Sequence, residues 1–275
     1  MQDSESYETR NVSDDVCLKA KRRKVVDVHD KVQKVPKFSL NRSKRCFDRR
    51  RVVKSCNARS SFVTLDRRTS PGPLSIAINS LSAEQKSLLF DIGFGSLIGF
   101  NIINLCPKLS FYVVDAFDGD DMVIRTTKGD ISCDREAVFD VFGISKDATE
   151  PIKSGVMRTG TSFYKDWVSQ FSVKDIRSSD ISAVIVKSKG VVDRFFKMNF
   201  LMLFYNTMIR CDSNGVVFRD VLEYLDGDCQ NASKIDWCGE LLYVLEYSKI
   251  KWNRYYPKKR PYCGPLTFLT VSVCL

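Results

Sequence analysis

Charge divides the 275 residues into a strongly basic first quarter and an electrically neutral remainder. Residues 1–70 hold 19 lysines and arginines against nine aspartates and glutamates, whereas residues 71–275 hold 24 of each kind. This asymmetry favours nuclear import or nucleic-acid contact for the basic segment. The remainder is rich in Phe, Leu, Val and Ile, and its roughly 200 residues are enough for one domain with its own core.

The same composition argues against several classes of protein. The most apolar stretch, 195–209, is short for a bilayer and is interrupted by polar residues, so it predicts a buried helix rather than a membrane span. The polar, acidic start predicts that no secretory leader is present. The ten cysteines include no Cys-x-x-Cys pair, and we expect reduced, intracellular thiols. With His29 as the single histidine, a zinc site is not expected.

Residues 1–70 have little hydrophobic periodicity, and we expect this arm to be disordered, because few apolar side chains can offset the chain entropy. Its two basic clusters resemble nuclear localisation signals, and they would also hold phosphates without sequence specificity. A solubilising tail without a partner is the alternative. The candidate residues for import or nucleic-acid contact are Lys19, Lys21, Arg22, Arg23, Lys24, Arg42, Lys44, Arg45, Arg49, Arg50, Arg51 and Lys54.

The Ser-Pro-Gly-Pro run at 70–73 predicts a linker, followed by a body of residues 74–275. A helix should begin near Ser82, because Gln85 follows at the spacing of a capping box. The glycines at 93–99 then predict a helix end and a tight turn. They lack the third glycine and the Lys-Ser/Thr of a phosphate-binding loop.

A β-rich region comes next. Residues 111–117 are aromatic and β-branched, and residues 122–127 alternate apolar and polar side chains. A Lys-Gly-Asp turn at 128–130 leads into a short return strand at 131–133, so we expect a hairpin. An acidic string, Asp115, Asp118, Asp120 and Asp121, precedes the turn. We interpret it as solvated turn carboxylates, because no bidentate acid follows at calcium-loop spacing.

The rest of the chain has a helical pattern. Asp134 should cap a helix over 135–142 that Gly143 ends. Further helices are predicted at 163–171, 180–188, 191–210, 218–225 and 235–252, with a turn at 212–215. The expected fold class is therefore mostly α with a small β-hairpin, behind a disordered basic N-terminal arm.

The basic segment 251–260 interleaves Trp252, Tyr255 and Tyr256 with lysines and arginines. Aromatic rings next to cations are typical of surfaces that stack single-stranded nucleic acid. The prolines at 257 and 261 favour a plain loop equally.

The chain carries no complete catalytic motif. A cysteine protease needs an imidazole to take the thiol proton, and the single histidine lies in the arm. A serine triad fails for the same reason. We find no paired-histidine metal motif, dinucleotide fingerprint or kinase signature, and we predict no cofactor. Acid–base catalysis by carboxylates alone follows no fixed spacing in sequence, so the sequence does not exclude it.

Several sequence segments of the body nevertheless resemble one family. They are LSIAINSLSAEQKSLLFDIGFGSLIGFNI (74–102), KLSFYVVDAFDGDDMVIRTTKGDIS (108–132), FKMNFLMLFYNTM (196–208), KIDWCGELL (234–242) and YCGPLTFL (262–269). Together they are similar to the N-terminal, non-catalytic region of plant transposon-encoded SUMO (ubiquitin-like-protein-specific) cysteine proteases. The region is also similar to the largely helical plant mobile domain, sometimes labelled aminotransferase-like.

The resemblance implies a non-catalytic nuclear interaction module of transposon origin. In such proteins the protease domain follows this region, so its catalytic residues match nothing here, and we expect a body truncated at its C-terminus. The alternatives are a fragment of a deSUMOylating peptidase, inert alone, and a DNA-binding accessory protein that acts through the arm. The aminotransferase label implies no pyridoxal cofactor, since no segment offers a Schiff-base lysine in a phosphate site. An import receptor is the expected partner of the arm.

Overall fold

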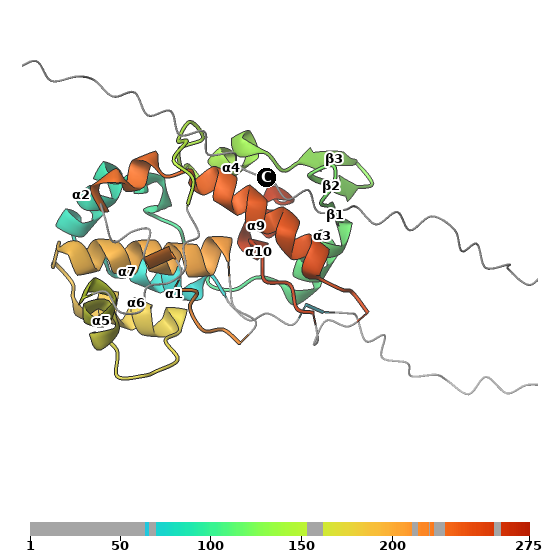
Figure 1. Cartoon of the computed structure of the whole chain (residues 1–275). Helices are drawn as coiled ribbons and strands as arrows, with labels where there is room; N and C mark the ends of the chain where they lie inside the picture. Colours follow the sequence, from blue (N-terminus) through green and yellow to red (C-terminus); the bar gives the residue numbers. More distant parts are fainter. Residues whose placement is uncertain are drawn as a thin grey trace, which may run out of the picture. The chain divides into compact units, whose positions relative to one another are not determined.

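The structure, a computed structural model, describes residues 64–65, 70–152, 162–210, 214–219, 221–222, 229–255 and 260–275. All of them belong to one of the two units of the chain, residues 58–275. The described part is mostly helical with a small antiparallel sheet, which confirms the predicted fold class (Figure 1). In this part, no helix has the length and apolarity that a membrane span requires. The expected disorder of the arm concerns residues that lie almost entirely outside the described ones.

The first half of the body contains α1 (Gly72–Ser80), α2 (Ala83–Asp91), α3 (Pro107–Ala116), β1 (Phe117–Asp118), β2 (Val123–Thr126), β3 (Gly129–Ser132) and α4 (Arg135–Phe142). The second half contains α5 (Ser162–Ser169), α6 (Ser178–Lys187), α7 (Arg194–Phe204), α9 (Trp237–Lys251) and α10 (Leu266–Ser272). Single turns of 3₁₀-helix lie at Gly95–Leu97 and Cys229–Lys234, and a π-helix at Tyr205–Ile209 continues α7.

Helix α7 forms the centre of the core. Every side chain from 198 to 204 is buried, and α1 and α6 pack against this helix (Figure 1). The Phe94 ring meets the rings of Phe204 and Trp237 edge to face, with centroids 4.9 and 5.6 Å apart. These contacts confirm the prediction of a buried helix over this stretch. The helix begins at Arg194 because Asp193 caps it, its side chain accepting the Phe196 N–H at 2.7 Å.

The predicted starts of the helices after Ser82 and after Asp134 are confirmed, and so is the end at Gly143. Ser82 and Gln85 form both halves of a capping box at the start of α2. Asp134 accepts the Ala137 N–H at the start of α4, and Gly143 ends that helix with a left-handed φ of 62°.

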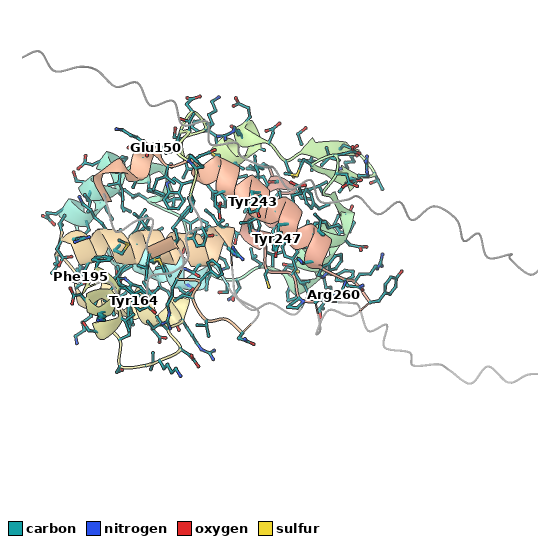
Figure 2. The ribbon with its side chains drawn as sticks, in the orientation of Figure 1. Glu150, Tyr164, Phe195, Tyr243, Tyr247 and Arg260 are labelled. Carbon is teal, nitrogen blue, oxygen red and sulfur yellow. The ribbon has the colours of Figure 1, made fainter. Side chains whose placement is uncertain are left out.

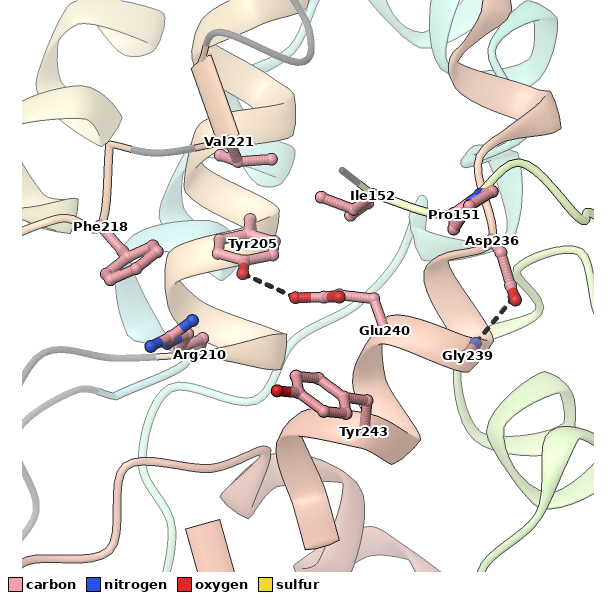
Figure 3. Close-up of a pocket in the computed structure, with 10 residues that line it drawn as sticks. All are labelled: Pro151, Ile152, Tyr205, Arg210, Phe218, Val221, Asp236, Gly239, Glu240 and Tyr243. Atoms are coloured by element: carbon pink, nitrogen blue, oxygen red, sulfur yellow. Dashed lines mark hydrogen bonds between the residues drawn. The ribbon is translucent and has the colours of Figure 1, made fainter. Parts of the chain in front are cut away.

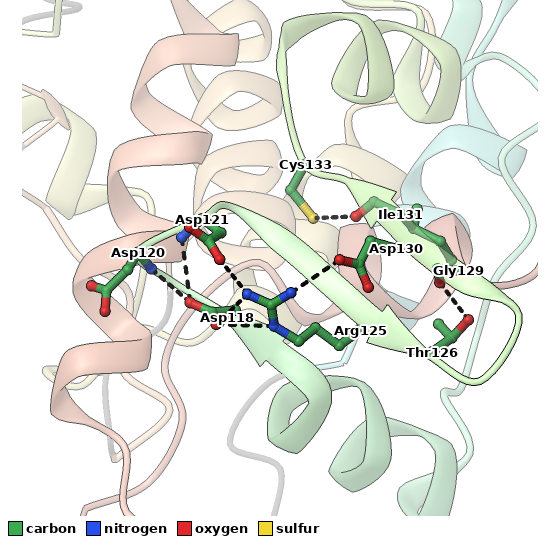
Figure 4. Close-up of polar contacts among 9 residues, drawn as sticks. All are labelled: Asp118, Asp120, Asp121, Arg125, Thr126, Gly129, Asp130, Ile131 and Cys133. Carbon is green, nitrogen blue, oxygen red and sulfur yellow. Dashed lines mark hydrogen bonds and ion pairs between the residues drawn. The ribbon is translucent and has the colours of Figure 1, made fainter.

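The predicted hairpin is present as β2 and β3, and β1 adds a third antiparallel strand at its edge. Arg125 on β2 donates to the carboxylates of Asp118 and Asp130 at 3.0 Å, and it also pairs with Asp121 (Figure 4). The aspartates assigned to a turn therefore surround a guanidinium. Asp118 also accepts the N–H of Asp121, and these bonds lower the pKa of its carboxyl.

Two local predictions are wrong. Residues 111–116 form the end of α3 rather than a strand, and only Phe117 is in a strand, β1. Pro107 fits the first turn of the helix, and Ser110, Val113 and Val114 recur on its buried face. The linker expected at 70–73 is instead the start of α1, whose first turn also accommodates proline.

Candidate binding site

A pocket of about 430 Å³ opens where the end of α7 meets α9 (Figure 3). Four segments supply its walls: Pro151 and Ile152, the π-helix after α7 with Arg210, Phe218 and Val221, and the start of α9. The lining residues are Pro151, Ile152, Tyr205, Arg210, Phe218, Val221, Asp236, Gly239, Glu240 and Tyr243.

Glu240 provides the carboxylate of the pocket. The Tyr205 hydroxyl donates to its Oε1 at 2.8 Å, and no hydrogen bond from the described residues reaches Oε2. Burial raises the pKa of Glu240 and outweighs the Tyr205 hydrogen bond and the nearby charge of Arg210, which lower it. Burial also raises the pKa of Tyr205, so its hydroxyl stays a donor. The carboxylate thus costs folding energy, which is typical of a group kept for function.

Arg210 provides the cation. Its guanidinium carbon lies over the Phe218 ring, 3.8 Å from the ring centroid. No carboxylate among the described residues pairs with it directly, although its charge is felt by Glu240 and Tyr205. The guanidinium also hydrogen-bonds the Tyr205 hydroxyl, and its further N–H groups can donate to a ligand.

The π-helix positions both groups. Asn206 is buried there and exchanges hydrogen bonds with the backbone of Phe218, donating from Nδ2 to the carbonyl at 3.2 Å and accepting the N–H at Oδ1. This pair holds the Phe218 ring beneath Arg210, while Tyr205 in the same turn points at Glu240 (Figure 3). Single π-turns inside helices are frequent at functional sites.

Asp236 closes the pocket but is already engaged. Its Oδ1 accepts the Gly239 N–H and an Arg135 N–H, each at 2.7 Å, and it caps α9. A Cβ on Gly239 would lie 2.2 Å from Asp236 Oδ2, so this turn requires glycine. Glu240 and Arg210 therefore remain the groups that can receive a ligand.

Beyond the pocket, the outer face of α9 carries exposed aromatic side chains. Tyr243 is 59% exposed, Tyr247 41% and Ile250 68%, whereas Leu241 and Leu245 on the inner face are buried. The two tyrosine rings stack with centroids 6.2 Å apart, and the Lys251 ammonium lies 5.3 Å from the Tyr247 centroid. We call Tyr243, Tyr247, Ile250 and Lys251 the α9 stripe; both tyrosines lie along the helix in Figure 2.

The structure separates the residues of the predicted stacking segment. Trp252 is only 9% exposed and packs edge to face on Phe111, so it belongs to the core. Tyr255 is 80% exposed beside Arg254, which pairs with Asp115 at 3.0 Å. Tyr256 and the twelve candidate cations of the arm lie outside the described residues.

A family model for a domain of unknown function, DUF8566, matches residues 67–270. The chain belongs to this family. No curated protein and no solved structure was found to match it. The matched range contains the whole pocket and the α9 stripe, so both belong to the family's domain.

The sequence analysis did not single out Glu240 or Arg210. The sequence does contain a signal for Glu240. It is an acidic residue placed between the apolar residues Trp237, Cys238 and Leu241, which belong to the core face of the helix. Arg210 carried no such signal, since its place over Phe218 depends on the hydrogen bonds of Asn206. Among the described residues, no three His, Cys, Asp or Glu side chains are grouped to hold a metal.

Proposed function

We propose that this chain is a non-catalytic interaction module of transposon origin that acts in the nucleus, and that the α9 stripe with the adjoining pocket is its contact surface. The resemblance of residues 74–269 to the region that precedes the protease domain in plant transposon-encoded SUMO proteases supports the origin. The basic arm supports the location.

The observation that carries this proposal is the two-faced character of α9. Its inner face is anchored in the core by Leu241 and Leu245, while its outer face exposes two stacked tyrosines and an isoleucine. Rigid, exposed tyrosines are the side chains that binding surfaces use most, because they offer contact area at low entropic cost. A pocket at the end of such a row supplies the place for an anchoring group.

The thiols support a non-catalytic role. Burial raises the pKa of Cys133 to about 12 and that of Cys238 to about 11, so both remain protonated at neutral pH. The only histidine of the chain, His29, lies in the arm. A buried, protonated thiol without an imidazole is not a nucleophile.

Site-specific photo-crosslinking in cells tests the contact surface whatever the partner is. A benzoylphenylalanine at position 247 of the full chain should give discrete adducts that disappear when Tyr243 is also replaced by serine. The matched control places the same group at Phe90, which is 65% exposed on α2. Absence of adducts at 247, or identical adducts at both positions, would remove the proposal.

A further inference from the structure

We infer that the contact surface of the proposed module takes single-stranded nucleic acid, with a guanine base in the pocket against Glu240 and Arg210 and its neighbour on Tyr247. This inference rests on the proposed function, because it names the partner of the same site.

The pocket presents the two groups that a guanine edge needs. The N1–H and N2–H of guanine are donors, and Glu240 offers a carboxylate whose Oε2 no described residue occupies. The O6 and N7 atoms are acceptors, and guanidinium is the side-chain group that most often pairs with them. Arg210 lies over Phe218 and, beside its hydrogen bond to Tyr205, has further N–H groups for this contact.

The shape and walls of the pocket suit a flat ring. Its volume of about 430 Å³ exceeds that of a base, and Ile152 and Val221 form an apolar wall on the side away from Arg210, while Asp236 is a second carboxylate in the lining (Figure 3). Tyr243 stands at the rim with 59% of its surface exposed, where its ring can cover the inserted base. Adenine presents an acceptor where guanine presents the N1 donor, so Glu240 would repel it.

The α9 stripe continues from the pocket as a stacking platform. Tyr243 and Tyr247 lie one helical turn apart, with ring planes 23° from parallel. Lys251 follows after another turn, beside the Tyr247 ring. Exposed rings alternating with cations are the features by which proteins hold single strands, the rings stacking on bases and the cations neutralising phosphates.

Cations follow the α9 stripe in the sequence; of the described ones, Lys251 and Arg260 are exposed and Arg254 pairs with Asp115. Segment 251–260 contains five lysines and arginines and no acid. The backbone carbonyl of Arg260 accepts the Asn253 N–H at 3.5 Å, so this residue lies beside the end of α9 (Figure 2). Glu246, an exposed acid on α9, opposes this charge. An apolar protein partner would gain nothing from these cations, which is why we favour a nucleic acid.

Fluorescence anisotropy with labelled 12-nucleotide strands tests the inference. The protein is the full chain with its twelve arm cations, defined above, replaced by glutamine, so that the arm does not contribute. The probes are oligothymidine with one central guanine, the same strand with adenine, and the uridine RNA equivalents. We expect the guanine strands to bind about tenfold more tightly than the adenine strands, in DNA, RNA or both. The ratio of the affinities for the DNA and RNA strands shows which nucleic acid the site prefers.

Four variants separate pocket from stripe. Glu240→Gln should reduce the affinity for the guanine strand to that for the adenine strand. Tyr247→Ala should weaken both by about tenfold, the usual effect of losing one stacked ring. Glu246→Lys should increase the affinity for both strands, whereas it would decrease the affinity for a basic protein partner. Phe90→Ala should change neither.

Three results would overturn the inference: no binding by the arm-neutral chain, equal affinity for guanine and adenine strands, or equal affinity for a duplex. Protein adducts from position 247 together with any of these would leave the proposed function standing. If neither adducts nor strand binding occurs, both proposals fall. Thermal unfolding of each variant checks that the fold is retained.

Discussion

Glu240, a partly buried carboxylate, is the residue that marks the pocket as a candidate binding site. Its pKa is raised by burial, so the ionised form destabilises the folded chain at neutral pH. An apolar or amide side chain there would be more stable. The single hydrogen bond from Tyr205 does not compensate for the burial, and a ligand with its own donors would.

We therefore expect Glu240→Gln to raise the melting temperature at pH 7. The raised pKa means that the folded state binds the proton of Glu240 more tightly than the unfolded state, so the wild type gains stability as the pH falls. The advantage of the variant should shrink as the pH is lowered from 7 to 4. Calorimetry across this range measures it, with Glu246→Gln, an exposed acid on the same helix, as the control. A variant that is less stable than wild type at pH 7 would contradict the assignment.

The cysteines yield the second prediction at this scale. A SUMO vinyl-sulfone probe should label none of them, because the buried thiols of Cys133 and Cys238 have raised pKa values and the described residues include no histidine. Intact-mass spectrometry after incubation at pH 7.5 reads the result, with an active SUMO protease as the positive control. Stoichiometric labelling of one cysteine, abolished by serine replacement, would restore the peptidase alternative.

At the scale of elements, Gln85 joins two helices that are distant in sequence. Its Oε1 completes the capping box of α2, while its Nε2 donates to the carbonyls of Ser188 and Val191 at 3.1 and 2.9 Å, between α6 and α7. The side chain is fully buried. One residue thus begins a helix and holds the connection that leads into the central helix.

Replacing Gln85 by leucine should lower the free energy of unfolding by about 2–4 kcal/mol, since two partly buried carbonyls lose their donor and the cap is weakened. Urea denaturation measures the change. Ser82→Ala, which removes only the cap, should cost about 1 kcal/mol. Ser87→Ala, on the exposed side of α2, should stay within about 0.5 kcal/mol. A Gln85→Leu effect no larger than that of Ser82→Ala would show that the bonds to Ser188 and Val191 contribute nothing.

What could be predicted from sequence follows from how local each signal is. The capping box at Ser82 and the Asp134 to Gly143 helix depend on side chains three to nine residues apart, and both were correct. The prediction of β-structure at 111–117 was wrong, because β-branched composition is a weak preference that packing overrides. The pocket was missed because its walls come from segments that only the fold brings together.

At the scale of the whole molecule, we propose different tasks for the two parts of the chain, because their charge is separated. The body is neutral and carries the family's domain, while the surplus of cations lies in residues 1–70. A surface that stacks bases needs only a few local cations, so it does not require the charge of the arm. The arm is therefore available for transport.

We expect residues 1–70 to carry a reporter into the nucleus, when the reporter is too large to diffuse through nuclear pores. Import receptors pair clustered cations with acidic grooves, so replacing residues 21–24 and 49–51 by alanine should return the reporter to the cytoplasm. Replacing the scattered Lys31, Lys34 and Lys37 is the matched control and should leave it nuclear. Quantitative imaging measures the ratio of nuclear to cytoplasmic signal. If the cluster variant stays nuclear, or if the control loses import equally, the density of charge in the clusters is not what the import machinery recognises.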